Sequence, residues 1–148
     1  MKATYRSVVL PALAALFLAL AAGPSMADER PIPDYRVKGA FLFNFARYTR
    51  WPLEALPQAD GPLILGILGK DPFGGILEQK AAGRTVQGRT LEIRRLQRAE
   101  EAVHCHLLFI ALSETERLPA IVKALEGKPV LTIGEGTVFA ATGGMIQF

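Results

Sequence analysis

Residues 62–69 read PLILGILG, an uninterrupted apolar run that begins with a proline and ends at a glycine. A short run in which neighbouring positions are all apolar predicts a strand that is buried on both faces. Residues 106–112 (HLLFIAL) and 129–133 (PVLTI) repeat this pattern later in the chain. Strands of this kind occur in parallel sheets covered by helices. The sequence therefore predicts an α/β fold, a single domain with a mainly parallel sheet flanked by helices.

Helix signals separate the predicted strands. Asp71 as N-cap and Pro72 at the first helical position predict a short helix that ends at Gly83. Residues 114–126 predict a second helix, which Gly127 closes. Helices in these places provide the long crossover connections that neighbouring parallel strands require.

Two further strands are expected at the margins of the sheet. Apolar and charged side chains alternate in residues 89–96, which predicts a half-exposed edge strand. Residues 138–140 and 144–148 are expected to form a terminal hairpin, or a strand with a broken approach. The predicted sheet thus has buried central strands and more exposed outer ones.

The most apolar helix predicted runs from Asp34, as N-cap, to about Arg50, and Pro52 ends it. At about 100° per residue, its apolar positions share one wide arc that also holds Asn44. The arc comprises Val37, Ala40, Phe41, Phe45, Tyr48 and Trp51, with Leu42 and Phe43 outside it on opposite flanks. Such a helix must be covered on more than one side, or it presents a contact face to a partner. Asn44 is expected to be a buried, hydrogen-bonded amide, with a place in a partner or ligand surface as the alternative.

The amino-terminal segment has the features of an export signal. Lys2 and Arg6 precede the uncharged apolar run of residues 8–22, and small residues follow at the cleavage positions. This order predicts a cleavable signal peptide over residues 1–27, followed by a polar, disordered lead over residues 28–34. A transmembrane anchor is the alternative, but the apolar run falls short of the roughly 20 residues that span a bilayer. We therefore expect a secreted protein that works outside the cytoplasm.

Charge and cysteine content exclude several classes of protein. Without its signal peptide the chain has 15 Lys and Arg against 14 Asp and Glu, a net charge of +1. The densest basic cluster, Arg94, Arg95 and Arg98, is too small to indicate nucleic-acid binding. Because Cys105 is the single cysteine, the domain cannot form an intramolecular disulfide and must be held together by its core.

No motif of the sequence indicates catalysis or a cofactor. Gly66 and Gly69 have the wrong spacing for a phosphate-binding loop and predict a structural turn. On a strand His104 and His106 would share one face and Cys105 the other, so the three cannot converge on one metal ion. Cys105 is expected to be a buried, small apolar residue, with a redox-reactive thiol as the alternative. We expect no enzyme activity, cofactor or metal.

Residues 35–52 (YRVKGAFLFNFARYTRWP) closely resemble the opening signature of the YfiR family. Further matching pieces follow in order, namely 68–73 (LGKDPF), 105–110 (CHLLFI), 129–134 (PVLTIG), and Phe139 with 143–146 (GGMI). The resemblance covers nearly all of residues 35–148. It implies a periplasmic α/β protein without catalytic activity.

The best-known member of this family binds the periplasmic sensor region of a membrane-bound diguanylate cyclase and represses it, which lowers cyclic di-GMP and biofilm formation. The resemblance thus implies a regulator that binds such a region and meets the membrane only through that partner. The residues implied for partner binding, or as family signature, are Lys38, Phe41, Leu42, Phe43, Asn44, Phe45 and Trp51. The sequence leaves open whether the protein also forms a homodimer.

The sequence departs from the family pattern in two ways. With Cys105 alone, redox control through an internal disulfide is not available to it. Family chains usually continue into a further strand and a C-terminal helix, whereas this sequence ends at Phe148, so a truncated domain is expected. Two other functions stay open, a small-molecule-binding module with a pocket near residues 69–73 and 134–136, and an enzyme without a recognised motif.

Overall fold

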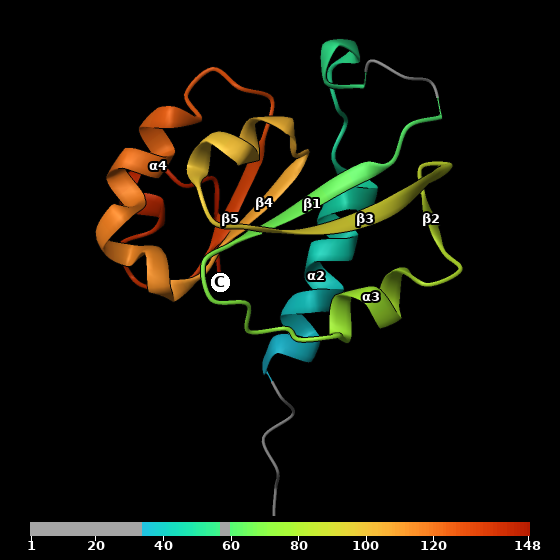
Figure 1. The fold of residues 1–148 in the computed structure, drawn as a ribbon, viewed down its shortest axis with the longest axis horizontal. Coiled ribbons are helices and arrows are strands. Elements are labelled where there is room, and N and C mark those ends of the chain that lie inside the picture. Colours follow the sequence, from blue (N-terminus) through green and yellow to red (C-terminus); the bar gives the residue numbers. More distant parts are fainter. Residues whose placement is uncertain (1–33, 57–59) are drawn as a thin grey trace, which may run out of the picture. The chain divides into compact units, whose positions relative to one another are not determined.

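The computed structural model describes residues 34–56 and 60–148. Its centre is a six-stranded sheet with the strand order β2-β3-β1-β4-β5-β6 (Figure 1). The strands are β1 (Leu63–Leu68), β2 (Thr85–Val86), β3 (Arg89–Leu96), β4 (Leu107–Ile110), β5 (Leu131–Gly134) and β6 (Ile146–Gln147). Neighbouring strands are parallel except β2, which runs antiparallel to β3. The predicted α/β fold with a mainly parallel sheet is confirmed.

Helical segments connect the strands and cover the sheet. The α-helices are α2 (Asp34–Tyr48), α3 (Ile76–Ala81) and α4 (Leu118–Ala124). Shorter 3₁₀ helices are η1 (Leu53–Ala55), η2 (Ala99–His104), η3 (Leu112–Arg117) and η4 (Ala140–Thr142). The predicted signal peptide, and all of the predicted lead except Asp34, lie outside the described residues.

Each face of the sheet has its own hydrophobic core, because successive side chains of a strand point to opposite faces. Leu65 and Ile67 of β1 pack with α2 and α3, whereas Leu68 of the same strand packs on the other side with α4. The helices accordingly lie on both sides of the sheet, with α2 and α3 opposite α4 (Figure 1). The continuous apolar run of β1 is therefore explained by burial on both faces.

The structure corrects two predicted helix boundaries. The helix expected at Pro72 begins only at Ile76, because Asp71 Oδ1 accepts a hydrogen bond of 2.7 Å from the Phe73 N–H and closes a turn instead. The helix expected from residue 114 begins as η3 and becomes α-helical at Leu118. Pro119 lacks the N–H that an α-helix through this point would need, which accounts for the late start.

Of the two arrangements expected for the end of the chain, the terminal hairpin is wrong and the strand with a broken approach is confirmed. η4 carries the chain back over the sheet, so that β6 pairs parallel to β5, with Ile146 opposite Ile133. The buried ring of Phe139 fills the space between Gly134 and Gly144, where any Cβ would collide with it. Two glycines and one aromatic ring therefore position the last strand.

Candidate functional site

The side of α2 that packs on the sheet is built around small residues. Gly39, Leu42 and Ala46 are buried, and Tyr35 packs partly against the same core. These positions follow the i, i+4, i+7, i+11 spacing of one helix face. Gly39 adjoins Ile76 and Leu77 of α3, so its lack of a side chain allows the two helices to pack closely, while Leu42 and Ala46 belong to the core beneath α2.

Part of the predicted apolar arc of α2 faces away from the sheet, whereas Phe45 and Trp51 of that arc pack partly against the core. Val37, Phe41 and Tyr48 have exposed fractions of 43%, 47% and 74%. Asn44, in the middle of the arc, is exposed as well, so the expectation that it is a buried amide is wrong. We call Val37, Phe41, Asn44 and Tyr48 the outer face of α2. Of the two arrangements open to so apolar a helix, the structure has the one with an uncovered face.

Phe45 connects this outer face to the last residues of the chain. Its ring centroid lies 6.1 Å from that of Phe41 and 6.1 Å from that of Phe148. Phe148 also lies 6.2 Å from Phe41 and 6.5 Å from Phe109 of β4, centroid to centroid. Aromatic side chains thus continue from the outer face of α2 to the segment that follows β6. Phe43, on the opposite flank, is partly buried against the core.

Lys38 anchors α2 to the end of β5. Its Nζ lies 2.5 Å from Glu135 Oε1, and Tyr35 donates a hydrogen bond of 3.1 Å to Glu135 Oε2. The Glu135 side chain is almost fully buried, and two partners compensate its charge. Lys38, a predicted partner-binding or signature residue, therefore positions the helix.

Trp51 does not belong to the outer face of α2. It lies in residues 49–56, which follow the helix and which we call the strap. The Trp51 ring packs edge-on against His106, with centroids 5.7 Å apart. His106 Nδ1 accepts a hydrogen bond of 3.0 Å from the Ile64 N–H, and His106 Nε2 lies 2.8 Å from the Ala55 carbonyl oxygen. This pair of partners assigns the proton of a neutral imidazole to Nε2. Burial of the ring lowers the pKa of His106, so the ring stays neutral and holds the strap to β1.

Gln87, which the sequence did not single out, completes the end of α2. Its side-chain amide donates to the carbonyl oxygens of Ala46, Arg47 and Thr49 at 3.1, 3.0 and 2.7 Å. Carbonyl groups in the last turn of a helix have no partner within the helix. The signal in the sequence was the Gln87-Gly88 pair between two short strands, a turn composition whose first residue adopts a positive φ of 54°.

The surroundings of Cys105 favour a buried structural residue over a reactive thiol. Cys105 is buried, and a Cβ placed on Gly66 would lie only 2.8 Å from its Sγ. Burial raises the pKa of the Cys105 thiol to about 11, so it stays protonated at neutral pH. Gly66 is thus required for close packing. Residues 34–56 and 60–148 contain no group of three or more His, Cys, Asp or Glu side chains that could hold a metal.

A small cavity of about 190 Å³ lies where the sequence predicts a ligand pocket, beyond the carboxyl ends of β1, β4 and β5. Its polar lining includes Tyr35, Lys70, Asp71, Ser113 and Glu135. Most of these groups have partners within the protein. Ser113 Oγ accepts a hydrogen bond of 2.9 Å from the Lys70 N–H, and Glu135 is held by α2. The cavity is smaller than the roughly 300 Å³ of ordinary ligand sites.

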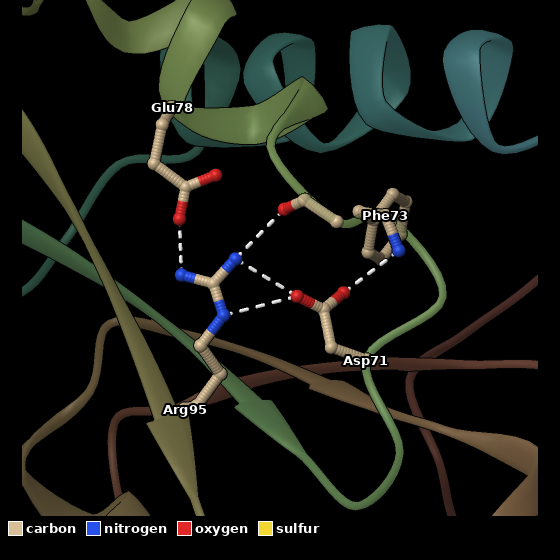
Figure 2. A network of polar contacts seen from close by, with 5 residues as sticks. Asp71, Phe73, Glu78 and Arg95 are labelled. Atoms are coloured by element: carbon tan, nitrogen blue, oxygen red, sulfur yellow. Dashed lines mark hydrogen bonds and ion pairs between the residues drawn. The ribbon is translucent and has the colours of Figure 1, made fainter.

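Arg95 of β3 holds the loop beside this cavity (Figure 2). Its guanidinium lies 2.8 Å from Asp71 Oδ2, donates to the Gly74 carbonyl oxygen at 2.8 Å, and pairs with Glu78 of α3. The hydrogen bond from Arg95 holds the pKa of Glu78 below its usual range. Asp71 and Glu78 therefore have a structural role as partners of Arg95. Within the described residues we find no catalytic pair of carboxylates.

These features define a class of protein, an α/β domain with an uncovered apolar helix face and, in the described part of the chain, no assembled catalytic group. The family model for YfiR/HmsC-like proteins matches residues 35–148, and the chain belongs to this family. A search of curated proteins found no match. The family is one of periplasmic regulatory proteins rather than enzymes. Among the described residues, no helix has the length and apolar character needed to cross a membrane.

Proposed function

We propose that this protein regulates a membrane signalling protein by binding its exported sensor region. The expected partner is a diguanylate cyclase, whose production of cyclic di-GMP the bound protein restrains. The observation that carries the proposal is the uncovered outer face of α2, with Phe41 and Tyr48 presented to solvent. Large aromatic side chains exposed together on a rigid element are typical of protein-interaction surfaces.

The contacts of α2 divide its residues into two groups. Leu42 and Phe43 pack against the core and Lys38 pairs with Glu135, so these residues hold the helix in place. Phe41 and Asn44 are exposed, and Phe45 supports Phe41 from the side. A helix fixed on one side and apolar on the other is pre-organised for binding, which lowers the entropy lost on association.

The size of the surface allows specific but reversible binding. Full burial of a large apolar side chain contributes about 1.5–3 kcal/mol, and the half-exposed residues of the outer face would contribute a fraction of that each. Val37, Phe41 and Tyr48 together then supply a few kcal/mol of the binding free energy. Such a moderate contribution suits a regulator that must release its partner.

The proposal is tested with the full-length chain in its own cells. The double variant Phe41→Asn/Tyr48→Asn should fail to capture a membrane diguanylate cyclase that the wild type captures, and cyclic di-GMP should rise as we expect after deletion. Leu112→Asn is the control, because Leu112 is about as exposed as Phe41 but lies at the start of η3. Unchanged cyclic di-GMP in the deletion strain, together with no captured sensor protein, would contradict the proposal.

A second candidate is a small-molecule-binding module, which the cavity beyond β1, β4 and β5 favours. In that case a periplasmic metabolite should raise the melting temperature of the purified protein. Ser113→Trp, which fills the cavity, should abolish the shift, whereas Phe41→Asn should leave it unchanged. A screen without any shift, or a shift that survives Ser113→Trp, counts against this candidate.

A further inference from the structure

We propose that the partner segment received by the outer face of α2 is an acidic, amphipathic helix. This inference rests on the proposed function and adds the chemistry of the partner. The observation behind it is charge. Residues 35–50 contain four basic residues and no acidic one. Glu135 compensates the charge of Lys38. Arg36, Arg47 and Arg50 are therefore the remaining charged residues beside the outer face of α2.

These three arginines are available to a partner. Arg36, Arg47 and Arg50 are all exposed, and within the described parts of the chain none of them forms an ion pair. Some other exposed arginines differ in this respect. Arg95 and Arg98, for example, pair with Glu78 and Glu101. Among residues 34–56 and 60–148, no carboxylate pairs with the positive charge beside the outer face, and carboxylates of a partner can pair with it.

The positions of the charges define a direction across the helix. At about 100° per residue, Arg36 and Arg47 lie within about 20° of each other, on one border of the outer face. The Arg47 guanidinium lies 5.6 Å from the centre of the Tyr48 ring, which belongs to the outer face. The other border is aromatic, formed by Phe45 and Phe148. A partner that matches both borders needs acidic residues on one side and apolar residues on the other, as an amphipathic helix has.

The dimensions favour a helix over an added strand. α2 has 15 residues and is therefore about 22 Å long, enough for three to four turns of a partner helix alongside it. The neighbouring strand β6 has only two residues, too few to pair securely with an incoming strand. The partner segment thus docks side by side with α2 and does not extend the sheet.

A lipid surface is the competing partner, because anionic headgroups also attract arginines next to aromatic residues. Asn44 argues against it. Its amide lies in the middle of the outer face, and insertion into lipid would remove its hydrogen bonds to water without replacing them. A protein segment can supply a hydrogen-bond partner at this point.

The first experiment reads the partner segment directly. A photo-reactive amino acid replaces Asn44 in the full-length chain, the cells are irradiated, and the crosslinked peptide is sequenced. We expect a peptide with Asp or Glu at i, i+3 or i+4 spacing beside apolar residues. Crosslinks to lipid alone, to a second copy of this chain, or to a segment without acidic residues would each overturn the inference.

The second experiment tests the charge. The crosslinked segment is made as a synthetic peptide, and its affinity is measured for the wild type, for Arg36→Glu/Arg47→Glu and for the control Arg84→Glu/Lys128→Glu. Arg84 and Lys128 are exposed residues outside α2, so the control carries the same change in net charge. We expect a loss of about tenfold or more only in the α2 variant, weaker binding at high salt, and recovery when acidic residues of the peptide become Lys. Equal affinities for both variants would overturn the inference.

The two proposals fail in different ways. If Phe41→Asn/Tyr48→Asn abolishes cyclase restraint while Arg36→Glu/Arg47→Glu retains it, the regulatory function holds and the acidic partner is wrong. If neither double variant changes restraint or binding, the outer face is not the contact surface and the acidic partner is wrong, whereas the regulatory function is contradicted only if deletion leaves cyclic di-GMP unchanged and no sensor protein is captured. Arg36→Gln/Arg47→Gln serves as the milder variant should the glutamates impair folding, and its loss should be smaller but in the same direction. Co-sedimentation of the wild type, but not of Arg36→Glu/Arg47→Glu, with phosphatidylglycerol vesicles would instead support a lipid partner and overturn the inference.

Discussion

The helices α2 and α4 cover opposite faces of one sheet but differ in what they present to solvent. α4 buries Leu118 and Ile121, with Leu125 buried just after its end, and its exposed positions are small or charged, such as Ala120 and Lys123. α2 buries Leu42 and Ala46 and exposes Phe41, Tyr48 and Val37. The apolar residues of α4 match what the sheet can cover, whereas α2 has more of them than the sheet can cover. The surplus marks α2 as the element with a role beyond packing.

The largest effect is expected from the buried sides of the two helices. Leu42→Ala and Ile121→Ala should each lower the free energy of unfolding by about 3 kcal/mol, because both leave a cavity under a helix. Urea unfolding of the mature protein measures both values. If Leu42→Ala costs less than about 1 kcal/mol, α2 is not held by its sheet-facing side and the comparison fails.

A somewhat smaller effect is expected at the anchor between α2 and β5. Lys38→Met should lower the free energy of unfolding by about 2 kcal/mol, because it leaves the buried Glu135 carboxylate without its cation. Arg94→Met is the control, since Arg94 and Glu92 form a pair on the surface and its loss should cost less than about 0.5 kcal/mol. Thermal melting distinguishes the two, and equal losses would argue against an anchoring role for Lys38.

The strap beyond the end of α2 should respond to pH. The folded protein lowers the pKa of His106, so the unfolded chain binds more protons below about pH 6.5. Stability is therefore full above that pH and decreases as the pH falls through it, by at most about 1.4 kcal/mol per pH unit. His106→Gln should remove this slope, whereas His104→Gln, a change at an exposed histidine, should keep it. Arg89 adds to the effect, since its positive charge opposes protonation of His106.

The smallest effect on stability is expected at the outer face. Phe41→Asn should change the free energy of unfolding by about 0.5 kcal/mol or less, because half of the side chain is already in water. Binding of a hydrophobic dye to the native protein should fall in the same variant. A destabilisation as large as that of Leu42→Ala would show that Phe41 is a packing residue, and the contrast between the two sides of α2 would disappear.

The prediction of α2 shows what hydrophobic periodicity can and cannot predict about a helix. Val37, Phe41 and Tyr48 of the predicted arc do share one exposed face of the helix, but Trp51 lies beyond its end and Phe45 packs partly against the core. An uncovered face was one of the two arrangements allowed. The expected burial of Asn44, however, was wrong. Periodicity identifies a helix face by its large apolar residues, but the face that is buried here holds Gly39, which adjoins α3, together with Leu42 and Ala46 in the core. Which face fits is a property of the partner surface, and no single helix encodes it.

Long-range contacts account for the other features that sequence reasoning missed. His106 bonds to Ala55 and Ile64, which lie 51 and 42 residues away in the chain. Gln87 caps α2 from 38 to 41 residues away. For the last strand the sequence left two arrangements open, because the parallel pairing of β6 depends on a ring that packs against two separate glycines. Such contacts arise only once the chain has folded, so local patterns do not reveal them.

The amino-acid order was sufficient for the fold class, because strands such as 62–69 must be buried on both faces and only helices on either side can cover them. It was also sufficient for the family, since the ordered pieces between residues 35 and 148 can be recognised from the sequence alone. Only the tertiary structure decided which side of α2 meets solvent and which cations remain uncompensated. Those properties depend on what each side chain touches across the sheet, and they are the ones from which the binding surface is inferred.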